Sequence, residues 1–203
     1  MSSVTSLCNN RIELLHQFFA AATHDASAAM CRWTNGLITL TLDEVREIAL
    51  EDLATTLEIG EDRLTMVVLT LEGELGGTMV LTFDDENGRE LAASLLCRTP
   101  GTGDEWNDLE KSALNETGNI LSCAYMNALT RLINAQLVPS PPMFIQDYGA
   151  SVLEQAVLQQ MGDGDEVMVC RTRFHREGNT LNWHVIFVPS LHLRSSLLGA
   201  LQA

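Results

Sequence analysis

Three polar residues near the middle of the chain stand at helical spacing: Ser112, Glu116 and Asn119. At about 100° per residue, their side chains fall within roughly 60° of one another on one side of a helix. Apolar residues mark the opposite side of the same stretch, at Leu114, Thr117, Leu121, Ala124, Ala128 and Leu132. A helix over 105–134 is therefore expected to pack by one face and to present a carboxylate and an amide outward, one turn apart.

These outward side chains could support chemistry, or they could belong to an ordinary solvated helix face. An amide accepts and donates hydrogen bonds without bringing a charge, whereas a carboxylate pairs with a cation. Asn119 is a poor helix former, so its interior position calls for a reason. Gly118 weakens a helix by about 1 kcal/mol relative to alanine. It either permits close approach of another helix or of a partner, or is merely tolerated.

Acidic residues indicate where this helix begins. Asp104 is a suitable N-cap, because its carboxylate can accept hydrogen bonds from free backbone N–H groups. Glu105 and Asp108 would lie at the positive end of the helix dipole.

Other familiar site types are absent from the sequence. The five cysteines are scattered and never spaced as CxxC, which argues against a disulfide framework and a zinc site. We expect most of them to be small buried hydrophobic residues in a reducing compartment. His24, Asp25 and Ser27 lie too close along one helix for a catalytic triad. No metal site and no phosphate-binding loop is expected.

Composition narrows the class of protein. The chain has 203 residues, 46% of them hydrophobic, so it can bury a core as one domain or two small intimate halves. Its net charge of -15 argues against nucleic-acid and anionic-membrane binding. No signal-type segment and no run of 18 apolar residues occurs, so we expect a cytoplasmic protein without membrane insertion.

Periodicity and turn residues predict alternating helices and strands. Residues 1–8 are expected to be frayed, residues 47–61 give no clear pattern, and Asn35-Gly36 is suited to end the first helix. The expected helices cover 11–34, 90–97, 105–134, 150–161 and 191–201. The expected strands cover 37–45, 66–71, 78–83, 143–146, 166–174 and 181–188.

The two halves of the chain have the same order of elements: a long helix, a strand, a hairpin of two strands and a helix. We therefore expect a single domain over 1–203, with repeat halves at about 10–98 and 104–203. Each half would expose an apolar sheet face if it stood alone, so an α/β fold with one six-stranded, mainly antiparallel sheet and packed helices follows. Superposing the long helices at an offset of 116 − 17 = 99 aligns Ser112, Glu116, Asn119 and Pro142 with Glu13, Gln17, Ala20 and Asp43.

The spaced set Ser112-x-x-x-Glu116-x-x-Asn119, followed after 22 residues by Pro142, resembles the CheC/CheX/FliY family of chemotaxis phosphatases. The flanking segments LNETGNILSCAYMNALTRL and LVPSPP resemble that family as well. The resemblance is clear from about Leu64 to Ala203. It implies a pseudo-twofold α/β sandwich.

The resemblance also implies an activity and roles for the residues. The substrate would be the aspartyl phosphate of a CheY-type response regulator, which supplies its own Mg²⁺ and phosphate-binding lysine. Asn119 would orient the attacking water and Glu116 would pair with that lysine, with Ser112 and Pro142 as supporting positions. No cofactor of the chain's own is implied. Some members of the family carry the motif on both long helices, but Gln17 and Ala20 leave only the second copy here.

Two other functions remain open for such a chain. It could be a non-catalytic module that binds the regulator, as flagellar-switch proteins with the same core do. Those proteins generally add a C-terminal assembly domain, and none follows Ala203, which favours the free-standing phosphatase. It could also be an adaptor that binds a CheD-like deamidase, a partner type known for the family.

Overall fold

The six strands of the computed structural model form one sheet, and residues 2–56, 59, 63–73, 75–101, 105–158 and 166–202 are described. In chain order the strands are β1 (Ile38–Ala49), β2 (Arg63–Leu71), β3 (Gly77–Phe83), β4 (Met143–Tyr148), β5 (Glu166–Arg176) and β6 (Asn179–Pro189). They are arranged as β1-β5-β6-β3-β2-β4, and every neighbouring pair is antiparallel. The predicted six-stranded antiparallel sheet is thus confirmed.

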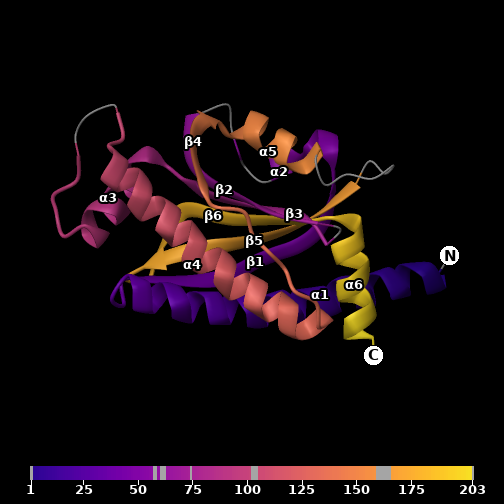
Figure 1. The fold of residues 1–203 in the computed structure, drawn as a ribbon. Helices are drawn as coiled ribbons and strands as arrows, with labels where there is room; N and C mark the ends of the chain where they lie inside the picture. The colour runs from indigo at the N-terminus through magenta and orange to yellow at the C-terminus, as the bar shows by residue number, and fades with distance from the viewer. Residues whose placement is uncertain are drawn as a thin grey trace.

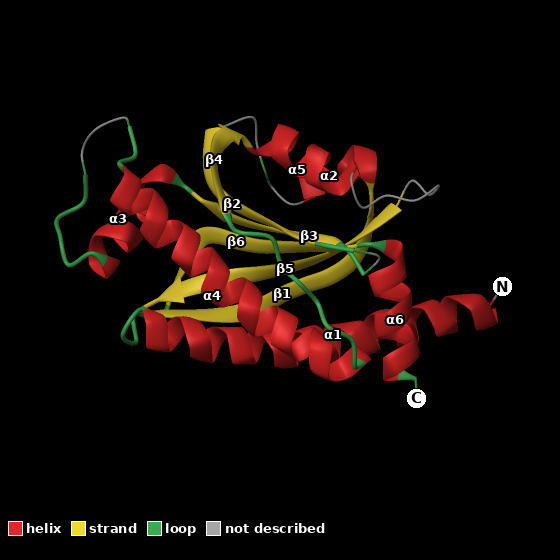
Figure 2. Cartoon of the chain, viewed as in Figure 1, coloured by secondary structure: helices red, strands yellow, loops and turns green. Residues whose placement is uncertain are grey.

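Helices cover both faces of the sheet (Figures 1 and 2). The face with the larger core carries the long helices α1 (Ser2–Trp33) and α4 (Asp108–Ile133), together with α3 (Asp85–Leu95) and α6 (Leu191–Leu201). The other face carries the short α2 (Leu53–Thr56), which follows a 3₁₀ turn at Leu50–Asp52, and α5 (Gly149–Leu158).

The alternation of side chains along β2 supplies both cores. Val67 and Leu69 face the long helices, whereas Met66 and Val68 face α2 and α5. All seven residues of β3 are buried, because this strand lies inside the sheet with helices over both of its faces. Such a strand reads as a continuous apolar run, and its side chains hold the two helical layers in place.

The strand order has a pseudo-twofold relation. Exchanging β1 with β4, β2 with β5 and β3 with β6 reproduces the same order in reverse, so the predicted pseudo-twofold sandwich is confirmed. The equivalent helices α1 and α4 lie side by side and antiparallel, with the hydroxyls of Thr23 and Tyr125 hydrogen-bonded at 2.8 Å. The left-handed residues that follow them, Asn35 and Asn134, have φ of 53° and 52° and are separated by 134 − 35 = 99 residues. This separation equals the offset derived from the sequence, while the bounds of the two halves stay a prediction.

Several boundaries differ from the prediction. The first helix begins at Ser2, so residues 2–8 are helical and not frayed. The first strand continues to Ala49, beyond the predicted end at residue 45. The prediction ended early because a bulge between Leu42 and Glu44 shifts the register and breaks the alternation of apolar residues. Helix α3 begins five residues earlier than expected, at Asp85. The predicted end of the 150–161 helix lies partly outside the described residues.

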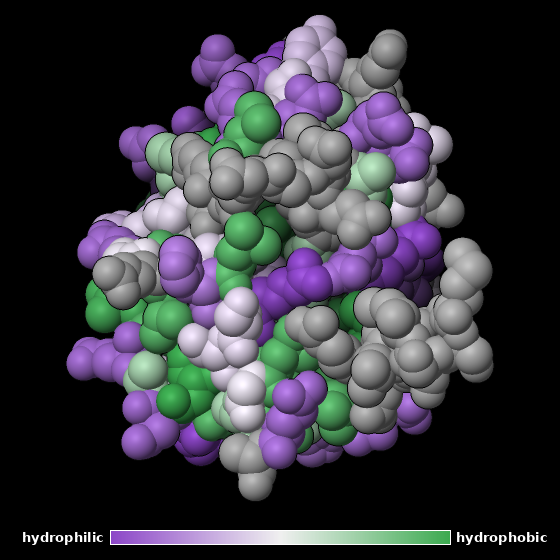
Figure 3. All heavy atoms as spheres, turned by 90° about the vertical axis from the view of Figure 1, so that its right-hand side faces the viewer, coloured by the Kyte–Doolittle hydropathy of each residue, from purple (hydrophilic) through white to green (hydrophobic). Residues whose placement is uncertain are grey.

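The surface at the α6 end of the molecule is mixed in character. Figure 3 shows hydrophobic residues in patches between hydrophilic ones on this face, beside residues that are not described. Within the described part of the chain, no helix is long and apolar enough to cross a membrane.

Candidate functional site

The first turn of α4 is fixed by a capping box. The side-chain oxygen of Asn107 accepts hydrogen bonds from the backbone N–H groups of Leu109 and Glu110 at 3.0 Å each. The carboxylate of Glu110 accepts in turn from the backbone N–H of Asn107 at 3.0 Å. The predicted N-cap, Asp104, was wrong: the helix begins three residues after the expected 105, and Asp104 itself lies outside the described residues.

The middle of α4 is held close to the sheet. A Cβ atom at Gly118 would lie 2.6 Å from Cγ1 of Val67 on β2, so only glycine fits the observed spacing. The neighbouring Thr117 accepts a hydrogen bond from Nε1 of Trp33 at 3.1 Å and donates to the carbonyl of Ala113 at 2.9 Å. Gly118 thus serves close approach, as one interpretation of the sequence had it, but the element that approaches is a strand.

The chain that follows α4 is hydrogen-bonded to β2. Ser140 donates its backbone N–H to the carbonyl of Thr70 at 2.7 Å, and its hydroxyl accepts from the N–H of Thr70 at 3.0 Å. The backbone N–H of Glu72 donates to the carbonyl of Val138 at 3.0 Å. These bonds fix Pro141 and Pro142 beside the first half of α4.

The four predicted site residues line one hollow, which we call the motif hollow. It is open to solvent, has a volume of about 490 Å³, and is bordered by Ser112, Glu116, Asn119 and Pro142. Four further residues border it: Asp108, Lys111, Asn115 and Pro141. None of these four was among the predicted site residues, although Asp108, Lys111 and Asn115 follow the same helical stripe as Asn119 and could have been found from spacing.

The polar side chains of the motif hollow are sparsely bonded. Glu116 is exposed and makes no hydrogen bond or ion pair within the described residues. Asn119 is half-buried, and its Oδ1 accepts one long hydrogen bond, 3.8 Å from the thiol of Cys123. The Oδ1 atom of Asn115 is buried without a hydrogen-bond partner in the described structure. The hollow therefore keeps the Glu116 carboxylate and the Asn119 amide available for an incoming molecule.

The motif hollow also contains a cation. The ammonium group of Lys111 lies 5.8 Å from the centre of the Phe144 ring, within the range of a cation–π contact. Lys111 stands beside Asp108 and one turn before Asn115 on the same helix. The hollow can therefore contact positively charged groups of a partner through Glu116 and negatively charged groups through Lys111.

The equivalent face of α1 lacks this arrangement. Glu13, Gln17 and Ala20 are exposed there, but Gln17 stands at the position of the Glu116 carboxylate and Ala20 at the position of the Asn119 amide. Asp43, aligned with Pro142, lies in the bulge of β1 and pairs with Arg171 and Arg173. Burial acts to raise the pKa of Asp43, but the hydrogen bond from Arg173 and the charge of Arg171 outweigh it and hold the pKa below its ordinary value.

The cysteines differ from the prediction. Cys123 and Cys97 are exposed, Cys31 is half-buried and Cys170 is buried. Burial raises the pKa of the Cys170 thiol and keeps it protonated. The expectation that most cysteines are buried was wrong, because only Cys170 is buried among the four whose burial is described; the exposed Cys123 stands one turn after Asn119.

Two relatives match the chain along nearly its whole length. The CheC1 protein of Halobacterium salinarum is 20% identical over 191 residues, which cover 94% of this chain and 96% of the relative. The CheY-P phosphatase CheC of Bacillus subtilis is 21% identical over 207 residues, which cover 100% and 99%. No family model matches the chain.

The fold is shared with a solved structure, FliY of Thermotoga maritima. The TM-score is 0.69 with 18% identity, and the match covers 95% of this chain and 96% of that one. The pseudo-twofold sheet and its paired long helices define an α/β sandwich of the CheC type. The full-length similarity to the two CheC proteins agrees with this fold, and the chain resembles CheC-like proteins in both sequence and fold.

Proposed function

We propose that this protein hydrolyses the aspartyl phosphate of a CheY-type response regulator in chemotaxis signalling. The observation that carries the proposal is the motif hollow, where Glu116 and Asn119 stand one turn apart on an exposed face beside Ser112 and Pro142. The similarity to the CheY-P phosphatase CheC supports it along the whole chain.

Asn119 is the residue that acts on water. Its amide oxygen accepts a hydrogen bond from the water and its NH₂ group donates one, which orients the water oxygen towards the phosphorus. The oxygen has two lone pairs, so the long hydrogen bond from Cys123 leaves one free. Attack forms the new P–O bond as the bond to the aspartyl oxygen breaks; the regulator recovers its carboxylate, and the proton leaves with inorganic phosphate.

Glu116 and the supporting positions act in docking. Because the Glu116 carboxylate has no partner among the described residues, it is free to pair with the phosphate-binding lysine of the regulator. Ser112 and Pro142 shape the two walls of the hollow. Mg²⁺ belongs to the regulator in this scheme, and the chain needs no cofactor of its own.

The proposal is tested by following the decay of a phosphorylated regulator. With Asn119→Ala we expect kcat to fall by about 10²-fold or more, about 2.7 kcal/mol, because the amide acts mainly in the transition state. The KM for the regulator should change little. Gln17→Ala removes the residue on α1 that aligns with Glu116, and it should leave the rate within about twofold.

Two outcomes would contradict the proposal at different points. If Asn119→Ala keeps the parental kcat and KM, the site is not in the motif hollow. If it loses affinity but keeps kcat, Asn119 does not position the water. Circular dichroism of each variant checks that the fold is intact.

A second candidate function is a non-catalytic adaptor. It is favoured by α1, where Gln17 lacks the carboxylate of the aligned Glu116 and Ala20 lacks the amide of the aligned Asn119. Such an adaptor would bind the regulator, like a flagellar-switch module, or a CheD-like deamidase. It would leave the decay rate of the regulator's phosphate unchanged at saturating concentration, which separates it from the phosphatase.

A further inference from the structure

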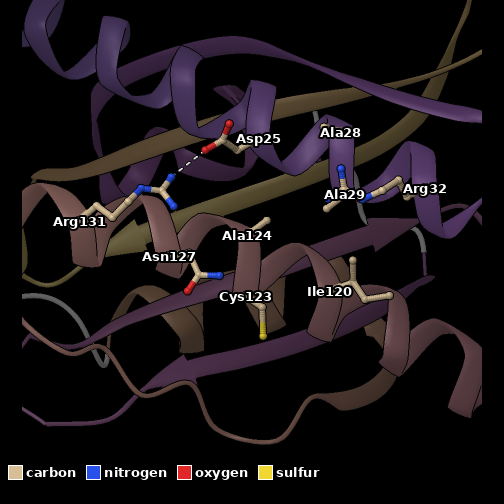
Figure 4. A pocket seen from close by; sticks show the side chains of 9 residues that line it. All are labelled: Asp25, Ala28, Ala29, Arg32, Ile120, Cys123, Ala124, Asn127 and Arg131. Atoms are coloured by element: carbon tan, nitrogen blue, oxygen red, sulfur yellow. Dashed lines mark hydrogen bonds and ion pairs between the residues drawn. The ribbon is translucent and has the colours of Figure 1, made fainter.

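A second groove runs between the two long helices, and we call it the helix groove (Figure 4). Its volume is about 440 Å³. Ala28, Ala29 and Arg32 form its α1 wall, whereas Ile120, Cys123 and Arg131 lie on α4. The small alanine side chains leave room between the helices that a partner's side chains can fill.

The helix groove adjoins the motif hollow. Figure 4 shows Cys123 pointing away from α1, and its Sγ lies 3.8 Å from Oδ1 of Asn119, which borders the motif hollow. Ile120 follows Asn119 directly in the sequence and borders the groove. Because α1 and α4 are antiparallel, the C-terminal end of α1, with Arg32, stands beside the α4 turn that carries the motif.

The helix groove is locally positive on an acidic protein. Arg131 is held by Asp25 at 2.7 Å, a pair that Figure 4 marks with a dashed line. Arg32 is exposed, and its guanidinium group makes no hydrogen bond or ion pair in the part of the chain that the structure describes. Two arginines against one aspartate give 2 − 1 = +1 along the groove, whereas the chain carries -15.

We propose that the helix groove is the second contact surface for the phosphorylated regulator, with Arg32 facing the acidic residues around the regulator's phosphoaspartate. The inference rests on the proposed function. A specific interface buries about 800 Å² on each partner, more than the motif hollow can supply, so a docked regulator must cover neighbouring surface. The groove begins one turn away, and its positive charge offsets the repulsion between an acidic phosphatase and an acidic pocket.

The first experiment is a thiol footprint on α1. Ala28→Cys places a thiol in the wall of the groove, and Ala21→Cys places one on an exposed position two turns earlier that does not border it. The probe is a purified CheY-type receiver from the source organism, activated with beryllium fluoride. At about ten times its Kd, the receiver should slow alkylation at position 28 about tenfold. Alkylation at position 21 should be nearly unchanged.

The second experiment measures affinity. Arg32→Glu should raise the Kd of the activated receiver about five- to tenfold and should weaken its dependence on salt. Arg63→Glu makes the same change of charge at an exposed residue on β2, outside both hollows, and should alter the Kd less than about twofold. Both residues are exposed, so neither change should unfold the protein.

The outcomes separate this inference from the proposed function. If the receiver binds and is dephosphorylated while position 28 stays unprotected and Arg32→Glu binds normally, the helix groove is not a docking surface and the phosphatase proposal stands. If no receiver binds at all, both proposals fall. If position 28 is protected by raising the concentration of the protein alone, the groove is an interface between copies of this chain.

Discussion

The amide of Asn119 adds little to the stability of α4. Asparagine lowers helix stability by up to about 0.7 kcal/mol relative to alanine. Its side chain obtains only a long hydrogen bond from a thiol, which is a weak donor. An interior residue that costs stability and gains little from its neighbours is expected where function requires it.

Glu116 is expected to act on docking as well as on turnover. Glu116→Ala should raise the Kd for the activated receiver and lower kcat, because the lost ion pair also fixes the register of the complex. The free energy of unfolding should change by less than about 0.5 kcal/mol, since the carboxylate is exposed and bonds to no described residue.

The measurement combines receiver titration with phosphate decay and urea unfolding. Glu116→Gln is the matched control, because it keeps the shape of the side chain and removes the charge. If Glu116→Gln binds as tightly as the parent, pairing with a lysine is not the role of Glu116.

Asn115 is expected to cost stability in the free protein. Its Oδ1 is buried without a hydrogen-bond partner, and a buried acceptor left unpaired is unfavourable. Asn115→Ala should therefore raise the free energy of unfolding by about 1 kcal/mol, from relieved desolvation and from higher helix propensity.

Asn127, exposed on the same helix, is the control for propensity alone, so Asn127→Ala should gain less in urea unfolding. A loss of stability in Asn115→Ala would mean that the oxygen has a partner, such as a bound water.

At the scale of elements, α1 and α4 have the same pattern of burial but contact the sheet differently. At the offset of 99, Leu15 and Leu114 are both fully buried. Phe19 occupies the position of Gly118, is fully buried and lies 5.9 Å from the ring of Phe187. The second helix thus brings its backbone against β2 with a glycine, whereas the first inserts an aromatic ring at the same point.

The close approach of α4 makes a specific prediction for Gly118→Ala. Helix propensity alone would favour alanine by about 1 kcal/mol, but the new methyl would meet Cγ1 of Val67, a stiff and fully buried side chain. Overpacking of this kind costs about 1–3 kcal/mol, so a net loss of about 1 kcal/mol is expected in urea unfolding.

The phosphatase rate of Gly118→Ala should fall too, because Glu116 and Asn119 move with the helix. Gly199→Ala is the matched control, because its methyl would meet nothing within 4 Å on α6. A higher stability in Gly118→Ala would show that the helix can move away from β2 at little cost.

Local sequence patterns predicted most elements but not every boundary. Alternating apolar residues identified all six strands, yet the bulge at Asp43 hid the end of β1, because one inserted residue inverts the pattern. The start of α4 was in the sequence as Asn107-x-x-Glu110, a capping box that outranks Asp104. Both errors concern the end of an element, where a single residue, a bulge or an alternative N-cap, decides the boundary.

At the scale of the molecule, the sequence predicted the α4 side of the candidate site but not the surfaces that adjoin it. The helical stripe of Ser112, Glu116 and Asn119 follows from spacing alone. The contact of Gly118 with Val67 joins residues 118 − 67 = 51 positions apart, and spacing cannot find it. The helix groove likewise depends on how α1 packs against α4, so its Arg32 carried no signal in the sequence.

One carboxylate joins four elements from both halves of the molecule. Asp85, at the start of α3, accepts hydrogen bonds from Thr65 of β2 at 3.1 Å and from Trp106, just before α4, at 2.9 Å. It also pairs with Arg89 at 3.1 Å and accepts from Gln146 of β4 at 3.5 Å. Burial acts to raise the pKa of Asp85, but these hydrogen bonds and the charge of Arg89 leave the pKa below its ordinary value.

A lowered pKa makes the contribution of Asp85 to stability dependent on pH. The ionised form is favoured by folding, so the contribution is present above the ordinary pKa near 4 and is lost as the pH falls through the lower value in the folded protein. Asp85→Asn should therefore unfold at a lower temperature than the parent at pH 7, and the difference should shrink below about pH 4.

The control is Glu86→Gln, on the next residue. It removes an exposed carboxylate for which no bond within the described residues is found, so its unfolding temperature should not converge with that of the parent at low pH. Thermal unfolding of the three proteins from pH 3 to pH 8 measures this. A difference between Asp85→Asn and the parent that stays constant down to pH 3 would mean that the charge of Asp85 does not hold the two halves together.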